Sequence, residues 1–288
     1  MPFDGLLVAL RFALYADLAA LAGLPLFWWS MGRRPASRRV LVALALGGLV
    51  LSALWLLASA AGMAGTPLLS PNWSIVAILL QETPVGTMLA IRAAALLLTL
   101  VALAAGGRKA GHPALVTLTA AIAAATLAWS GHAAASEGVG GSIHRIADAL
   151  HVWAAAGWFG ALLALLGAAF QKPPQVADTA RMLERFSIFG TIFVATLILT
   201  GALNSVMIVG IANLPALLHS LYGALLLAKL ALFAAMLLLA AANRWHLTPR
   251  LQANAALTHL RLSLLVETVL ALGILALVAA LGTLDPLS

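Results

Sequence analysis

The sequence predicts an all-α, polytopic membrane protein with about eight transmembrane helices. Hydrophobic residues make up 63% of the 288 residues, charged residues make up only 9%, and the mean hydropathy is +1.06. Apolar runs of about 20 residues, the length of a helix that spans a hydrocarbon core, recur along the whole chain. This composition excludes a soluble globule. Eight such spans use nearly all of the chain, so we expect one transmembrane domain, residues 1–288, without an extramembrane domain.

The first predicted span covers residues 5–30. Asp4 precedes it, and four basic residues follow it: Arg33, Arg34, Arg38 and Arg39. A cleavable signal peptide has its basic residues first, so we expect this span to be retained. The second span covers residues 40–63. A polar loop follows, and residues 74–81 are expected to lie at the interface or to begin the third span early.

The third span starts at residue 83 or 86 and runs to residue 105. The remaining predicted spans cover residues 113–130, 146–170, 187–209, 221–242 and 262–281. The connection 171–186, predicted as a loop, carries Lys172, Arg181 and Arg185. The connection after the seventh span begins with Asn243-Arg244.

The basic residues predict the orientation of the chain. With eight crossings, the loops after the first, third, fifth and seventh spans face one side, and they hold 12 of the 16 Lys and Arg residues. The other side has only Arg145. By the positive-inside rule, both termini and the segment 132–151 face away from the cytoplasm. The net charge of +7 is then explained by membrane-side anchors, and we expect no nucleic-acid partner.

An internal echo predicts a parallel repeat of four plus four helices. The segment Thr83-Pro84-Val85-Gly86 with Arg92 resembles, 137 residues later, Ser220-Leu221-Tyr222-Gly223 with Lys229. Each copy opens a helix and places a cation two turns deeper. An even number of helices per unit preserves orientation, which gives possible halves 1–137 and 138–288.

A histidine cluster is the strongest candidate site. If the helix begins near Ser142, then His144, Asp148 and His151 project from one face. A hairpin would bring His132 beside them. Each residue alone has an ordinary explanation, as an interfacial histidine, a cap or a satisfied polar group. Together, in a chain with so few charges, they indicate a metal site at one membrane face.

Three imidazoles favour copper over the other first-row divalent metals. Asp148 would be a fourth ligand or would orient a ring by accepting its second N–H, and we favour the orienting role. Seven residues of helix separate His144 from His151 by about 10 Å, so they either share one ion or are two successive stations on an entry path, with only one of them sharing an ion with His132.

Four further residues are second-tier candidates for the same site. Met63, Met88 and Met207 all lie toward the outer ends of their spans, where packing is the commoner role but a thioether would suit Cu(I). Asn204, late in the sixth span, is expected near the outer cavity as a hydrogen-bond donor or weak ligand.

Five ionisable residues fall within apolar spans: Arg11, Asp17, Arg92, Lys229 and Glu267. A central charge costs about 3 kcal/mol on insertion scales, so we expect these side chains to avoid lipid. We expect Lys229 to pair with Glu267 and Arg92 with Asp17, which would fix helix registry. A polar route for a cation or for protons is the alternative for Lys229 and Glu267.

The chain resembles the CopD family of copper-resistance inner-membrane proteins. The resemblance rests on Gly131-His132-Ala133, on His144, Asp148, His151 and Trp153, on Gly157-Trp158-Phe159-Gly160, on Tyr222-Gly223 and Lys229, and on the turn from Asn243-Arg244 to Pro249. It implies a role in bacterial copper homeostasis, with copper handled between periplasm and cytoplasm. It also implies His132, His144 and His151 as the histidine positions, and a small periplasmic copper-binding partner of the CopC type.

Two other classes of function stay open. A haem-binding electron-transfer protein would use two histidines as axial ligands. A membrane assembly factor without transport would not need the histidines. An enzyme is not expected, because no nucleophile, base and acid constellation and no phosphate loop occurs in the sequence.

Overall fold

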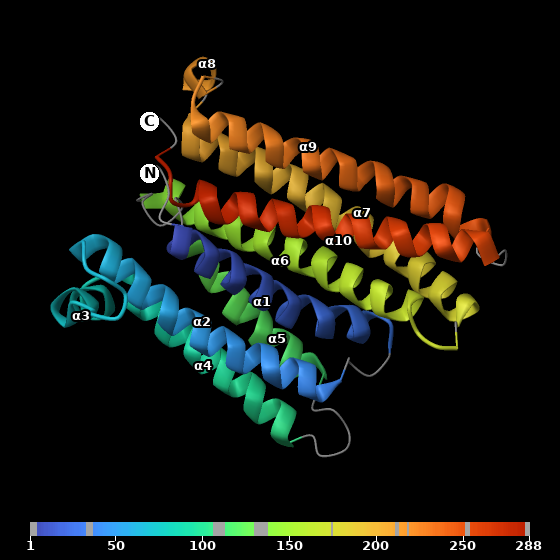
Figure 1. The fold of residues 1–288 in the computed structure, drawn as a ribbon, viewed down its shortest axis with the longest axis horizontal. Helices are drawn as coiled ribbons and strands as arrows, with labels where there is room; N and C mark the ends of the chain where they lie inside the picture. Colours follow the sequence, from blue (N-terminus) through green and yellow to red (C-terminus); the bar gives the residue numbers. More distant parts are fainter. Residues whose placement is uncertain are drawn as a thin grey trace.

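The computed structural model describes residues 5–32, 37–105, 113–129, 138–173, 175–210, 213–217, 219–250 and 254–285. They form a bundle of long helices, with both ends of the chain at the same end of the bundle (Figure 1). The helices are α1 (Gly5–Ser30), α2 (Arg38–Ala64), α3 (Trp73–Gln81), α4 (Pro84–Ala105), α5 (Pro113–Ala125), α6 (Gly138–Ala169), α7 (Val176–Val209), α8 (Leu214–Leu217), α9 (Leu221–Ala242) and α10 (Asn254–Leu281). A 3₁₀ turn, η1 (Thr126–Trp129), ends α5, and a π turn, η4 (Asn243–Leu247), ends α9.

Seven described helices are long and apolar enough to cross a membrane: α1, α2, α4, α6, α7, α9 and α10. The remaining predicted span corresponds to α5 with η1, which together form a shorter apolar helix, Pro113–Trp129. This helix packs against α4 and α1 (Figure 1). The prediction of an all-α, polytopic membrane protein is confirmed, with seven full-length candidate spans where about eight were predicted.

Two helix boundaries differ from the sequence prediction or refine it. The connection predicted as a loop, residues 171–186, is largely helical, because α7 begins at Val176. Arg181 lies in its first turns and donates to Asp178 at 3.2 Å, a pairing that supports helix beyond the apolar span. Helix α6 begins at Gly138, ahead of Ser142. The condition for placing the histidines of this helix on one face is therefore met.

Helices α1 and α6 form the most extensive contact between helices. Their backbones touch where Gly23 crosses Gly160: a Cβ on Gly160 would lie 2.1 Å from the carbonyl carbon of Gly23. Such close approach requires glycine on both helices and is a common way for helices to associate in a bilayer. Helices α1 and α6 are thus joined by a glycine contact in the second half of each helix.

Helices α4 and α9 begin in the same way. The hydroxyl of Thr83 accepts a hydrogen bond from a backbone N–H of the first turn of α4, and the hydroxyl of Ser220 does the same for α9. A Cβ on Gly86 or on Gly223 would lie within 2 Å of a carbonyl oxygen of the short helix that precedes it, α3 or α8. The two segments that are similar in sequence therefore also have similar local geometry at the starts of α4 and α9.

The expected pair of Arg92 with Asp17 is wrong. Arg92 Nε donates to Thr126 Oγ1 at 2.7 Å, and its guanidinium lies 6.0 Å from the centre of the Trp55 ring. The Asp17 carboxylate instead faces Gly47 of α2, and its Oδ2 has no partner among the described residues. The arginine bonds the neighbouring helix because η1 brings the Thr126 hydroxyl to it.

The expected pair of Lys229 with Glu267 is also wrong. Glu267 accepts from Asn243, so this pair defines the level at which antiparallel α9 and α10 meet. Lys229 precedes Asn243 on α9 by fourteen residues, or about 21 Å at roughly 1.5 Å per residue. The stagger between the helices, which the sequence does not encode locally, therefore separates the two charges.

Candidate functional site

A cavity of about 210 Å³ that contains several polar side chains lies at the end of the bundle that holds the two termini. It is enclosed by α1, α6, α7, α9 and α10, and we refer to it as the outer cavity. Its polar lining residues are Arg11, Tyr15, His144, Asp148, His151, Asn204, Ser205, Tyr222 and Lys229. The structure thus brings together on one cavity six residues that the sequence singled out individually: Arg11, His144, Asp148, His151, Asn204 and Lys229.

His151 has a defined hydrogen-bonding state. Its Nδ1 lies 2.9 Å from Thr200 Oγ1 on α7. The Thr200 hydroxyl donates its own proton to the carbonyl oxygen of Thr196 at 2.5 Å. Because that proton is already used, Thr200 accepts from the ring, and Nδ1 carries the hydrogen. A neutral His151 therefore presents Nε2 as an unprotonated nitrogen, the form in which imidazole binds a metal.

The carboxylate of Asp148 is hydrogen-bonded to a side chain of α7. Asn204 Nδ2 donates to Asp148 Oδ1 at 3.1 Å, and Lys229 lines the same cavity from α9. The side-chain oxygen of Asn204 is buried and has no partner among the described residues. The hydrogen-bond partner that orients the His151 ring is Thr200. The sequence does not predict this partner; it favours Asp148 in the orienting role.

His144 lies two turns before His151 on α6 and is almost fully buried, with 1% of its surface exposed. It lines the outer cavity together with His151. His132 falls outside the described residues. Within the described ranges, no three His, Cys, Asp or Glu side chains form a group that could hold a metal ion.

The three candidate methionines, Met63, Met88 and Met207, do not line the outer cavity. Met63 is on α2 and is 67% exposed, and Met88 is on α4. Met207 is on α7 and is 37% exposed, with its methyl group near Gly140. Arg11, in contrast, reaches the cavity from α1, where its Nη2 donates to the Tyr15 hydroxyl at 2.7 Å.

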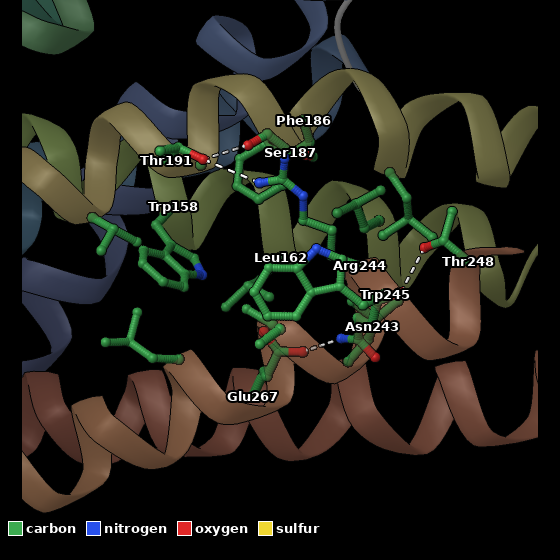
Figure 2. Close-up of a pocket in the computed structure, with 18 residues that line it drawn as sticks. Trp158, Leu162, Phe186, Ser187, Thr191, Asn243, Arg244, Trp245, Thr248 and Glu267 are labelled. Atoms are coloured by element: carbon green, nitrogen blue, oxygen red, sulfur yellow. Dashed lines mark hydrogen bonds between the residues drawn. The ribbon is translucent and has the colours of Figure 1, made fainter.

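Two further cavities follow along α6 toward the other end of the bundle. A middle cavity of about 440 Å³ shares His151 and Lys229 with the outer cavity. An inner cavity of about 210 Å³ shares Trp158 with the middle cavity and contains Asn243 and Glu267 (Figure 2). Polar groups therefore lie at both ends of a series of three cavities, and mainly apolar residues line its centre.

The fold and these cavities define a multi-pass membrane protein with a histidine-containing polar cavity at one end of its bundle. Residues 1–142 match the family model "Copper resistance protein D-like, N-terminal domain", and residues 180–281 match "Copper resistance protein D". The chain is 38% identical to "Copper resistance protein D" of Pseudomonas syringae pv. tomato, over 98% of this chain and 97% of that protein. It is 33% identical to "Inner membrane protein YebZ" of Escherichia coli strain K12, over 82% of this chain and 81% of that protein. No solved structure matches it.

The chain therefore belongs to the copper resistance protein D family. The resemblance recognised from the residues is confirmed at the level of the family, as is a multi-pass protein of the inner membrane. This family is not a known family of enzymes.

Proposed function

We propose that this protein binds copper in the outer cavity and moves it across the inner membrane, with copper as its substrate. The observation that carries the proposal is the hydrogen bond from His151 Nδ1 to Thr200, which leaves Nε2 as a free donor nitrogen inside a polar cavity. Imidazole nitrogen is a good ligand for copper in either oxidation state.

His144 supplies an earlier station on the same helix. It is separated from His151 by seven residues, or about 10 Å along the axis, which is too far for the two rings to share one ion as a pair. We propose that copper passes from His132 and His144 to His151. Asp148 and Asn204 line the same cavity, and the Asp148 carboxylate offsets the cationic Lys229.

The series of three cavities supports movement rather than storage. His151 and Lys229 line both the outer and the middle cavity, so an ion held at His151 lies at the boundary between the two cavities. Beyond it, Trp158 stands between the middle and inner cavities. An assembly factor would need no such series.

We further propose that the outer cavity and both termini face the periplasm. Lys172, Arg181, Arg185 and Arg244 all lie at the opposite end of the bundle, where the positive-inside rule favours the cytoplasm. A periplasmic copper-binding protein of the CopC type is then the partner expected at the outer cavity.

The proposed architecture is eight crossings in a repeat of four plus four, with α5 and η1 completing the fourth crossing. Each proposed half consists of two spans, a short outer helix and two further spans: α1 to α5 with η1 in the first half and α6 to α10 in the second. The contact of Gly23 with Gly160 supports it, because these residues are separated by the same 137 positions as Gly86 and Gly223. A residue that meets its own repeat counterpart lies on the axis that relates the two halves.

The test is copper binding and copper movement by the variant H151A. Purified protein is titrated with Cu(I) against a chromophoric chelator, and vesicles with the reconstituted protein are assayed for copper uptake. We expect H151A to lose the tight site and copper movement, whereas H219A, which changes an exposed histidine near the same end of α9, keeps both. Wild-type copper binding and movement in the triple variant of His132, His144 and His151 would exclude the site. A Soret band in the purified protein would favour haem instead.

A further inference from the structure

The inner cavity contains a buried carboxyl group that copper binding does not require. Glu267 of α10 is only 2% exposed, and it lines a cavity whose other walls are largely apolar, including Trp158, Leu162 and Phe186 (Figure 2). Its Oε1 accepts from the side-chain amide of Asn243 and from Ser263 Oγ at 3.5 Å. The carboxyl group is therefore positioned by two side chains and is not paired with a cation among the described residues.

The π turn η4 presents Asn243 to this carboxyl group. The backbone N–H of Thr248 donates to the Asn243 carbonyl oxygen, five residues back, and the Thr248 hydroxyl donates to the same oxygen at 2.7 Å. This wider turn occurs where α9 ends, opposite Glu267 (Figure 2). Single π turns are rare and frequently occur at functional sites.

The amide oxygen of Asn243 lacks a donor. Asn243 is 4% exposed, and its Oδ1 has no hydrogen-bond partner among the described residues. Leaving a buried acceptor unsatisfied costs about 1–3 kcal/mol, so the amide oxygen of Asn243 is a position where a hydrogen-bond donor would be stabilising. An ionised carboxylate can only accept, whereas a protonated carboxyl group adds one O–H donor to the site.

The other groups around Glu267 favour a proton over a metal ion. None of the described residues that line the inner cavity offers an imidazole or thioether, so copper finds no soft ligand there. Arg244, from η4, is the one other charged side chain lining it, and it donates to Thr191 of α7 at 3.3 Å. Helices α6, α7 and α9 add no titratable side chain to this lining, and no described residue of α1 belongs to it.

We propose that Glu267 is a proton-exchange site at the inner end of the molecule, with Asn243 and Ser263 as its positioning residues. The carboxylate takes up a proton from the cytoplasmic side to form the carboxylic acid, and it becomes a carboxylate again when the proton is released toward the opposite side of the membrane. The exchanged proton is the coupling ion for copper movement. This coupling rests on the proposed function, whereas the proton site itself does not.

Infrared difference spectroscopy of the purified protein tests the site without copper. We expect a carbonyl-stretch band of a buried carboxylic acid that appears as the pH is lowered. The band is expected to be absent from E267Q, retained at a shifted frequency in E267D and unchanged in E184Q, which alters an exposed glutamate of α7. A band of wild-type size in E267Q overturns the proposal, and so does its absence from wild-type protein at every pH at which the protein stays folded.

Vesicles loaded with a pH-sensitive dye test the coupling. We expect copper addition to change the internal pH with wild-type protein and E184Q, and the pH change to fall at least tenfold with E267Q, although E267Q still binds Cu(I) with wild-type affinity. A wild-type pH change in E267Q overturns the coupling. If wild-type protein moves no copper while its titrating band is present, the proposed transport fails and the proton site stands.

Discussion

At the scale of single residues, the hydroxyl of Thr200 determines what His151 can do. It donates to its own helix at Thr196 and therefore has only acceptor capacity left for the ring. Holding the hydrogen on Nδ1 fixes both the tautomer and the orientation of the imidazole, which is how residues beyond the ligands tune metal sites. In the proposed copper site, Thr200 therefore orients the His151 ring without being expected to touch the metal.

Replacing Thr200 with valine should weaken copper binding. T200V keeps the shape of the side chain but removes the acceptor for Nδ1–H, and loss of such a partner typically costs about 10–100-fold in metal affinity. The measurement is a Cu(I) competition titration of the purified variant. T191V, at an exposed threonine of the same helix, should bind like wild type. Equal affinities for T200V and wild type would show that the ring needs no orienting partner.

The residues of the outer cavity differ in how far the sequence predicts them. His144, Asp148 and His151 follow from helical spacing on one stretch of chain. Thr200 does not, because a threonine in an apolar helix that bonds the carbonyl four residues back is ordinary and gives no signal. The sequence identifies Glu267 as an ionisable residue within an apolar span. It does not identify Asn243 as the partner of Glu267, because the level at which two helices meet depends on packing along their whole length.

At the scale of helices, the glycine contact between α1 and α6 is a close constraint on packing. Substitution G160A would place a Cβ 2.1 Å from the backbone of Gly23, and backbone cannot move aside as a flexible side chain can. Overpacking of this kind costs about 1–3 kcal/mol. We expect a lower midpoint of thermal unfolding and a lower yield of monodisperse protein.

Gly167 provides the matched control on the same helix. A Cβ there meets nothing within 4 Å, so G167A should unfold like wild type. If G160A and G167A have equal unfolding temperatures, the stability of the bundle does not depend on this crossing.

The helices were predicted more reliably than their ends. Apolar length identifies a span because the bilayer requires it, and each predicted span has a helix in the structure. The start of α7 at Val176 was missed because polar residues that continue a helix into water carry no apolar signal. The π turn at Asn243 was missed because one extra residue in a turn leaves the composition unchanged.

At the scale of the whole molecule, the helix order and the basic residues support one topology. Val139, 80% exposed at the start of α6, lies at the end that holds the outer cavity, and the exposed Lys172 follows the other end of that helix. The chain has no cysteine. Single cysteines can therefore be introduced at both positions without a background signal.

We expect V139C, and not K172C, to react with an impermeant thiol reagent added to intact cells whose outer membrane has been permeabilised. After disruption of the inner membrane both should react, which serves as the control for accessibility. Labelling of K172C alone in intact cells would invert the topology, and the outer cavity would then open to the cytoplasm.

The contact of Gly23 with Gly160 also sets the mechanics of the molecule. Two helices whose backbones touch at one point can tilt about it, but they cannot slide past each other or separate without breaking that contact. The α1–α6 pair is therefore a pivot. Helix α9 packs mainly against α10, and only Tyr222, Gly223 and Met236 of its residues are buried. If the protein moves copper as proposed, a path past Trp158 opens only when helices other than this pair move, so a crosslink between α9 and α6 should reduce copper movement while leaving the Gly23–Gly160 contact intact.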